Sequence, residues 1–346
     1  MRNGKVIGGE FDLDMRGLSG AFGNDFLKDG FLYSSGRAAL YNILLSIEGR
    51  IGQGKALYLP DYLCHTIAQT AQKTSFVIKY YRLNDSLEID RKDFENRYEK
   101  GSAVLLINYF GLQTLSFQID YLKSLDSLVC VIEDNVQSFH SMFEDSKADY
   151  RFTSFRKSLP VPDGGWVKTS FEMPQPAGAN TFAQYKVAGG ILKSLRDYGC
   201  VDDSLYLKLL EEGESRIDGN LTSGISRLSL ELFSGIDTES EKSLRQRNAA
   251  YVSKCLKQVG VRQILGHEES KVALFIPVWL EDRDKARKAL FSNQIFCPVH
   301  WPVEPDITGP LAKGQEMAGH ELSIIVDQRY GLQEMDMIID TLLYGN

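Results

Sequence analysis

Between residues 34 and 134, short apolar runs alternate with segments of helical periodicity, and this alternation restricts the possible fold more than any other feature. The strand-like runs are KALYLP, FVIKYYRL, SAVLLINYF and SLVCVIED. The helix-like segments among them are SSGRAALYNILLSI, YLCHTIAQTAQK and FQIDYLKSL. Strands joined by helices of this length are typical of an open α/β sheet with mostly parallel strands.

The sequence after residue 134 indicates a second lobe. The length of the whole chain, 346 residues, points the same way, since single cores seldom grow beyond about 250 to 300 residues. A breaker-rich loop is expected at 172–180, helices at 181–217, and a long helical stretch broken near Gly235. Strand and helix patterns then alternate again from residue 260. We therefore expect a large domain at 1–220, a connecting helical segment at 221–258, and a small C-terminal α+β domain at 259–346.

Charge and composition narrow the choice of partners and compartment. A net charge of −7 and a pI near 5.4 argue against a nucleic-acid-binding protein, which needs clustered Lys and Arg. No apolar run resembles a signal peptide or reaches the roughly 20 residues of a membrane helix. The five cysteines are scattered and form no C-x-x-C pair, which favours reduced thiols. A cytoplasmic protein without a membrane span is expected.

Ligands of an open α/β sheet bind at the carboxyl ends of its strands, and polar residues gather at such positions here. Ser35, Gly36 and Arg37 open a helix, where backbone N–H groups and the helix dipole suit a phosphate. An ordinary N-cap serine followed by glycine gives the same sequence. Neither G-x-G-x-x-G nor a Walker A sequence occurs, so a dinucleotide enzyme is disfavoured.

Two further features lie at predicted strand ends. Glu133-Asp134, followed by Gln137, ends the run SLVCVIED, where a carboxylate holds a ring nitrogen or a metal, or where two acids simply face solvent. No histidine cluster of metal-ligand spacing accompanies the acids, so no metal site is expected.

The stretch TSFRKSLPVPDGG places Lys157 in a loop that two prolines and a glycine pair restrict. A lysine in a fixed loop can act as a nucleophile toward a carbonyl. One cofactor uses all three features: pyridoxal phosphate (PLP) has a phosphate, a ring nitrogen that works best when protonated, and an aldehyde that reacts with lysine.

Taken in order, SSGRAAL, LPDYLCHTIAQ, VIEDNVQS, TSFRK…DGG, NAAY, CPVHWPV and VDQRYG resemble the DegT/StrS family of PLP-dependent sugar aminotransferases. The resemblance implies fold type I, with a mostly parallel seven-stranded sheet in the large domain, a small C-terminal domain, and a homodimer that shares its sites across the interface.

The resemblance also assigns roles to single residues. Lys157 corresponds to the lysine that binds the cofactor aldehyde, and Asp134 to the acid that keeps the ring nitrogen protonated. Gln137 lies beside the ring hydroxyl in this correspondence. The phosphate is bound by Ser154 and by the helix start at Ser35, Gly36 and Arg37.

Several positions depart from the family pattern. Ser154 precedes Lys157 by three residues rather than five, whereas the distance from Lys157 to Gly164 fits the family. Cys64 and His65 stand where members place an aromatic ring, so His65 is the candidate for stacking on the cofactor. Gly224 falls where an arginine crosses the dimer interface, which leaves Asn220, Thr222 or Ser223 as candidates for that contact.

Three residues are candidates for substrate contacts. Arg156 is either a substrate or phosphate clamp or a surface charge. His300 and Trp301 either line the substrate cleft or serve packing.

The sequence thus predicts an aminotransferase that moves an amino group from glutamate to a keto-sugar, possibly linked to a nucleotide. Alternatives are a non-catalytic homologue that keeps a PLP or sugar ligand, and a PLP-dependent sugar dehydratase. The dehydratase should carry histidine in place of Lys157.

Overall fold

The computed structural model describes residues 6–13, 22–23, 25–302 and 312–345. Its centre is a seven-stranded sheet with the strand order β2-β8-β7-β6-β5-β3-β4. Strands β4, β3, β5, β6 and β7 run parallel, and β8 and β2 are antiparallel to their neighbours. The strands are β2 (Phe31–Tyr33), β3 (Ala56–Pro60), β4 (Val77–Tyr81), β5 (Ala103–Ile107), β6 (Cys130–Asp134), β7 (Tyr150–Ser154) and β8 (Gly165–Thr169). The predicted α/β class and mostly parallel sheet are confirmed.

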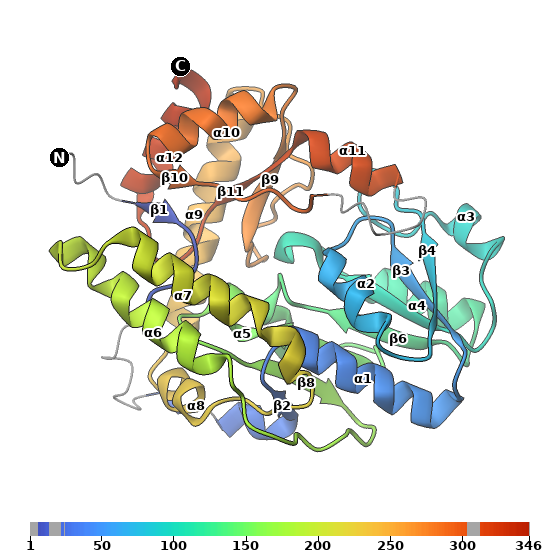
Figure 1. Ribbon diagram of the computed structural model, residues 1–346. Helices are drawn as coiled ribbons and strands as arrows, with labels where there is room; N and C mark the ends of the chain where they lie inside the picture. Colours follow the sequence, from blue (N-terminus) through green and yellow to red (C-terminus); the bar gives the residue numbers. More distant parts are fainter. Residues whose placement is uncertain (1–5, 14–21, 24, 303–311, 346) are drawn as a thin grey trace.

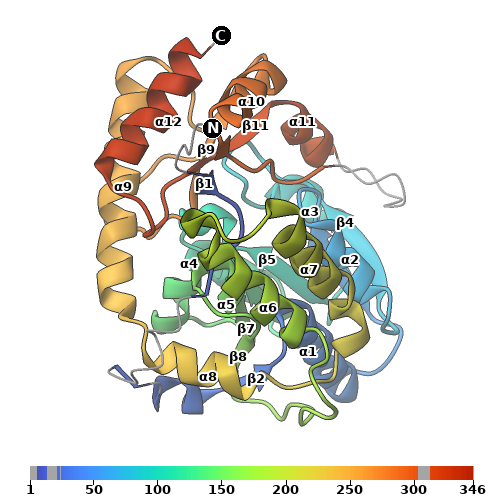
Figure 2. The same ribbon diagram turned by 60° about the vertical axis from the view of Figure 1, so that its left-hand side comes forward.

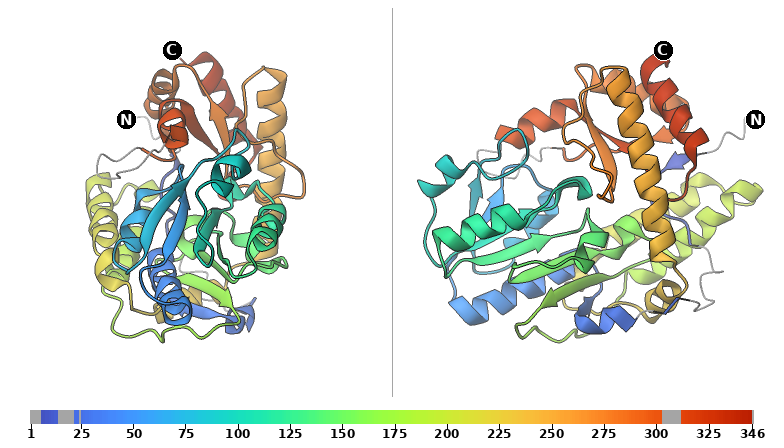
Figure 3. Two further views of the ribbon diagram at one scale, coloured as in Figure 1. Left: turned by 90° about the vertical axis from the view of Figure 1, so that its right-hand side faces the viewer. Right: turned by 180° about the vertical axis from the view of Figure 1, so that it is seen from behind.

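Helices cover both faces of this sheet (Figure 1). Helices α1 (Gly36–Ile51) and α2 (His65–Ala71) pack on one face, and α4 (Ser116–Leu125) lies on the other, as the left view of Figure 3 shows. This two-sided cover explains why β3, β5, β6 and β7 are buried along their whole length. Short helical segments complete the large lobe: η2 (Asp25–Asp29), α3 (Arg91–Glu95), η3 (Tyr109–Gly111), η4 (Phe139–Phe143) and α5 (Phe155–Ser158).

A helical hairpin follows the predicted loop at 172–180. It consists of α6 (Ala183–Ser194) and α7 (Asp203–Ser215), with η5 (Arg196–Tyr198) and η6 (Ile217–Asn220) at their ends. Next come α8 (Arg227–Ser234) and the long α9 (Thr238–Gln258), which runs from the large lobe to the small one (Figure 2). The break lies at Gly235, the C-cap of α8, as the sequence predicted.

The small lobe contains two short sheets. Strands β9 (Phe275–Trp279) and β11 (Glu321–Ile325) pair antiparallel. The second sheet joins β10 (Ile295–Phe296) to β1 (Ile7–Gly8) in parallel. The lobe is completed by α10 (Arg283–Ser292), α11 (Ala312–His320) and α12 (Leu332–Tyr344), which pack around these strands and the end of α9 (Figures 1 and 2).

Strand β1 pairs with a strand of the small lobe rather than with the central sheet. It lies within the range 1–220 expected for the large domain, yet its backbone pairs with β10, and the Gly8 amide donates to the hydroxyl of Tyr330 at 2.7 Å. Residues 1–5, 14–21 and 24 of the expected large domain, and 303–311 and 346 of the small one, lie outside the described residues.

The two lobes are also joined at the edge of the large sheet. Asp61, directly after β3, accepts a hydrogen bond from the amide of Lys313 at 3.3 Å, and its carbonyl accepts one from Gly314 at 3.0 Å. These contacts hold the start of α11 over the large lobe. No helix in the described part of the chain is long and apolar enough to cross a membrane.

Candidate active site

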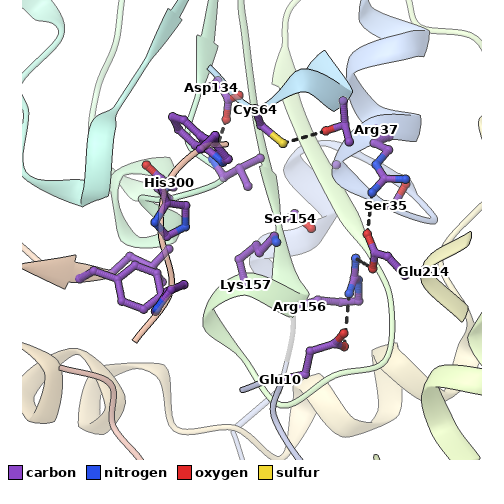
Figure 4. Close-up of a pocket in the computed structure, with 18 of the residues that line it drawn as sticks. Glu10, Ser35, Arg37, Cys64, Asp134, Ser154, Arg156, Lys157, Glu214 and His300 are labelled. Carbon is purple, nitrogen blue, oxygen red and sulfur yellow. Dashed lines mark hydrogen bonds and ion pairs between the residues drawn. The ribbon is translucent and has the colours of Figure 1, made fainter. Parts of the chain in front are cut away.

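A cavity of about 410 Å³ lies between the carboxyl ends of the sheet strands and the small lobe, a volume that suits a small-molecule ligand. It contains ten of the eleven residues predicted for the site. They are Ser35, Gly36, Arg37, Asp134, Gln137, Ser154, Arg156, Lys157, His300 and Trp301. Figure 4 shows Lys157, Asp134, Ser154 and His300 around one space.

Lys157 extends into this cavity from α5, which follows β7 directly (Figure 4). Among the described residues, none is within ion-pair distance of its Nζ. The following loop is held in place at Asp163, whose Oδ2 accepts from the Ser226 amide at 2.8 Å and whose Oδ1 accepts from the Ser226 hydroxyl at 2.7 Å. Lys157 lies on the short helix α5 rather than in the loop where it was expected, and Asp163 fixes the loop that follows this helix.

The glycine pair after this loop allows β8 to pack against the start of α1. Gly164 has a φ of +120°, and its amide donates to the carbonyl of Ser34 at 2.7 Å. A Cβ on Gly165 would lie 2.2 Å from the carbonyl oxygen of Ser35. Both glycines therefore fix the position of the helix start relative to Lys157.

The start of α1 has the free backbone amides that an anion site requires. The Ser35 hydroxyl accepts from the Ala38 amide at 3.1 Å, so Ser35 is the N-cap and its side chain is already committed. The first amides of a helix have no partner inside it, which leaves those of Gly36 and Arg37 to a ligand. A Cβ on Gly36 would lie 3.0 Å from the Ser154 Cβ, so glycine is what lets Ser154 approach the helix start.

Asp134 ends β6 at the opposite side of the cavity and is 3% exposed. Its Oδ1 accepts a hydrogen bond from the Val136 amide at 2.8 Å. Burial raises the pKa of Asp134 to about 7, against the opposing effect of that hydrogen bond. Glu133 is also buried and lies 3.4 Å from Arg151. The alternative of a solvated acidic pair is therefore wrong.

Gln137 lies close to Asp134 in the cavity wall. Its Oε1 accepts from the Phe110 amide at 2.9 Å, which fixes the orientation of the amide group. The Nε2 group of Gln137 donates no hydrogen bond to any described residue, so it is available to a ligand.

The side chain of Arg156 is only 10% exposed and is held by two carboxylates, which contradicts the alternative of a surface charge. Its guanidinium lies 3.1 Å from Glu214 and 3.6 Å from Glu10. Arg37 also pairs with Glu214, at 2.5 Å, and Lys186 lies 3.1 Å from the same carboxylate. Burial alone would raise the pKa of Glu214, but Arg156 and the other cations lower it far below its usual value. Glu214 thus stays ionised and holds three cations beside the start of α1.

His300 and Trp301 line the cavity from the small lobe and also pack against aromatic rings. The Trp301 ring lies 4.9 Å from that of Tyr62, and the His300 ring lies between Phe110 and Phe275. Burial and the nearby Lys157 lower the pKa of His300 to about 3. The ring is therefore neutral at physiological pH.

His65 does not line the cavity, which corrects its expected stacking role. It is the first residue of α2, whose N-cap is Cys64, and the residues of this turn that face the cavity are Cys64, Thr66 and Ile67. The helical rotation between neighbouring residues turns His65 away, so a thiol lies where an aromatic ring was expected.

Several other residues of the cavity wall were not singled out from the sequence, although Asp327 and Arg329 lie in the VDQRYG stretch. They come from the N-terminal segment, α7, α9 and the end of β11, and comprise Glu10, Glu214, Arg245, Asp327 and Arg329. Only the packing of distant segments brings them together.

Comparison with solved structures reveals clear relatives of this architecture. A DegT DnrJ EryC1 StrS aminotransferase from Brucella abortus is similar with a TM-score of 0.62 and 18% identity, over 91% of this chain and 85% of that chain. The sugar aminotransferase CalS13 from Micromonospora echinospora has a TM-score of 0.61 and 15% identity, over 92% and 88% of the two chains. The fold is that of the sugar aminotransferases.

The sugar aminotransferase fold also includes an enzyme of another activity. The GDP-4-keto-6-deoxy-D-mannose-3-dehydratase of E. coli, solved with bound hydrated PLP, matches with a TM-score of 0.64 and 16% identity, over 99% of this chain and all of that chain. No protein-family model matches the sequence, and no curated protein matches it significantly. The sugar aminotransferase fold is thus established by structure at low sequence identity.

Proposed function

We propose that the protein is a PLP-dependent aminotransferase that transfers an amino group from glutamate to a nucleotide-linked keto-sugar. The observation that carries this proposal is Lys157, which has no ion-pair partner among the described residues and extends from the short helix α5 into the same cavity as a buried aspartate and a free helix start. Proteins of the same fold are sugar aminotransferases, and one related dehydratase was solved with PLP.

The residues present fit PLP at each of its polar groups. The Gly36 and Arg37 amides and the Ser154 hydroxyl suit the phosphate and would form its cradle, which a side chain on Gly36 would fill. Asp134 suits the ring nitrogen, since its buried carboxylate has no cation partner among the described residues and would be stabilised by a protonated ring. When bound, PLP supplies an electron sink for the carbon that carries the amino group.

The roles of the chain's own residues follow from these positions. Lys157 would hold the cofactor through its Nζ and, once released by the amino donor, carry a proton between donor and cofactor. Asp134 would keep the ring nitrogen protonated, and Gln137 would donate its Nε2 to the ring hydroxyl. Glu214 orients Arg37 and Arg156 beside the phosphate cradle.

Lys157 also supports the aminotransferase over the dehydratase. The resemblance to the DegT/StrS family implies that dehydratases carry histidine at the position of this lysine, and the fold alone is common to both activities. The non-catalytic alternative differs in one respect only, since it would bind the cofactor without turning over.

The first test is spectroscopic. Purified protein supplied with PLP should absorb in the visible range, and borohydride reduction should fix the cofactor to a peptide that contains residue 157. Lys157→Ala should abolish both the fixation and the activity while the fold remains intact. Lys147→Ala is the matched control, because that lysine is a surface residue paired with Asp120. Covalent attachment at another lysine would refute the assignment.

The second test separates catalysis from binding. Addition of L-glutamate should convert the cofactor spectrum to that of the amine form and release 2-oxoglutarate, and a keto-sugar nucleotide such as GDP-4-keto-6-deoxy-D-mannose should restore the first spectrum. Two half-reactions through one site predict ping-pong kinetics. Bound cofactor that no amino donor converts would favour the non-catalytic alternative.

We further propose a cytoplasmic homodimer. All five cysteines are free, and Cys130 and Cys297 are buried, which suits a reducing compartment. For the contact across the dimer, Thr222 is the best of the three candidates because its side chain is exposed. Asn220 and Ser223 are buried in their own chain, where Asn220 binds Thr181 and Ser223 donates to the Asn220 carbonyl.

A further inference from the structure

A chain of hydrogen bonds connects a buried carboxyl group to the histidine in the cavity wall. The His300 Nδ1 lies 2.7 Å from the Ser323 hydroxyl, and that hydroxyl lies 2.5 Å from Glu321 Oε1. The second oxygen, Oε2, accepts from the backbone amide of His300 at 2.6 Å. Glu321 and Ser323 are both fully buried on β11. Aminotransferase chemistry as described above makes no use of these two residues.

The direction of this chain depends on the proton of Glu321. A backbone amide can only donate, so Oε2 accepts, and a proton on Oε1 can be donated to the Ser323 hydroxyl, which makes Oε1 the favoured site for a proton on Glu321. When Glu321 is ionised, Ser323 donates to it and the His300 Nδ1 carries a proton that it donates to Ser323. When Glu321 is protonated, it donates to Ser323, the serine donates to Nδ1, and the ring proton moves to Nε2.

We propose that Glu321, acting through Ser323, sets which nitrogen of His300 carries the proton, so that the cavity receives a hydrogen-bond acceptor when Glu321 is ionised and a donor when it is protonated. Nε2 is the nitrogen concerned, because His300 lines the cavity and Nε2 makes no hydrogen bond to any described residue. Figure 4 shows the ring facing the same space as Lys157.

Glu321 is the group that titrates in this series of hydrogen bonds, because the titratable groups that face it do not change charge in the same range. Burial raises the pKa of Glu321 to about 8, against its hydrogen bonds from Ser323 and His300 and the charge of Arg283. Tyr62 and Cys297 also face Glu321, but burial raises the pKa of both, to about 12 for Cys297. They remain neutral where Glu321 titrates.

The histidine itself stays neutral over the same range. Burial, followed by the charge of Lys157, lowers the pKa of His300 to about 3. A neutral ring has one N–H and one acceptor, so the change at Glu321 alters the tautomer of His300 rather than its charge.

The consequence for the substrate rests on the proposed function. A keto oxygen accepts a hydrogen bond, whereas the amino group that replaces it donates one. A ring that presents either a donor or an acceptor can therefore position both the keto-sugar and the amino-sugar. Glu321 and Ser323 are positioning residues in this scheme, because they act on the substrate only through His300.

The test is nitrogen NMR of the full-length protein with ¹⁵N-labelled histidine, which requires neither cofactor turnover nor a sugar. The chain has five histidines, and His300→Gln identifies the signal. The long-range ¹H–¹⁵N spectrum should show the proton on Nε2 at pH 6 and on Nδ1 at pH 9.5. His320 is an internal reference, because its Nδ1 lies 3.1 Å from the Leu280 carbonyl, which can only accept.

Two variants test the connection. Glu321→Gln has nearly the same shape and must present its NH₂ to Ser323, so His300 should keep its proton on Nε2 at both pH values. Ser323→Ala should remove the pH dependence of the tautomer. A wild-type tautomer that is equal at pH 6 and 9.5, or a change of tautomer that persists in either variant, would overturn the proposal. None of these NMR results depends on whether Lys157 binds PLP. The proposal on the His300 tautomer and the proposed function can therefore be refuted independently.

Discussion

The buried carboxylate of Asp134 should make the cofactor-free protein less stable as the pH rises, and Asp134→Asn should remove this effect. Asp134 is 3% exposed, and its partner in the described structure is the amide of Val136 at 2.8 Å. An asparagine keeps that hydrogen bond through its Oδ1. The substitution therefore removes a charge and leaves shape and hydrogen bonding nearly unchanged.

The magnitude follows from the pKa of Asp134, which burial raises from 3.8 to about 7. At 1.36 kcal/mol for each pKa unit, the ionised group costs the folded state up to about 4 kcal/mol. The pKa of Asp134 is higher in the folded state than in the unfolded state. The contribution of Asp134 to stability is therefore fully present below about pH 4, where Asp134 is protonated in both states, and it is lost as the pH rises through about 7. Between pH 5 and 8.5 the loss is about 3 kcal/mol.

Urea unfolding of the cofactor-free proteins at pH 5 and 8.5 measures this quantity directly. The free energy of unfolding of Asp134→Asn, relative to wild type, should increase by up to about 3 kcal/mol between these pH values. Asp145→Asn, at an exposed aspartate, is the control and should show no such increase. A difference between wild type and Asp134→Asn that does not change with pH would refute the argument from burial.

Added PLP should reverse the order of stability of wild type and Asp134→Asn. A protonated ring beside Asp134 offsets the charge in wild type, whereas the asparagine gains nothing from it. Wild type should therefore gain more stability from PLP than Asp134→Asn does, and the half-reaction with glutamate should be slower in the variant.

Two further predictions concern packing and assembly. Gly165→Ala should destabilise the protein by about 3 kcal/mol in urea unfolding, because its Cβ would lie 2.2 Å from the Ser35 carbonyl oxygen. Gly49→Ala, in open space within α1, should instead stabilise it by about 0.5 to 1 kcal/mol, and equal effects at both glycines would contradict the packing argument. Light scattering should show two chains per particle, with an interface above about 2,000 Å² in total; a fully active monomer would exclude a shared site.

The sequence predicted the elements whose signal is local. The runs that became β3, β4, β5 and β6 are apolar and short, and the helices between them have clear periodicity, so the alternation alone was sufficient. The end of α8 at Gly235 was likewise visible, because glycine ends helices for a local reason.

The strands on either side of Lys157 gave no such signal. β7 has the sequence YRFTS, whose polar residues suggest a surface loop, yet the whole strand is buried. Arg151 lies 3.4 Å from Glu133, and the Thr153 hydroxyl donates to the Asn135 carbonyl at 2.8 Å. Their partners lie on or beside the neighbouring strand β6, so the polar pattern of β7 makes sense only once the sheet is assembled.

The charge of the phosphate cradle shows most clearly what local reasoning misses. Arg37 and Arg156 were visible as candidate anion ligands, and two free cations would attract any phosphate. In the structure both pair with Glu214, which comes from α7 about 60 residues beyond Arg156, and each has a further carboxylate partner, Asp218 for Arg37 and Glu10 for Arg156. Under the proposed function, a ligand phosphate would therefore be selected by the geometry of the α1 amides and Ser154 rather than by excess positive charge. This arrangement favours a small phosphate ester that enters the cradle over polyanions that bind through charge alone.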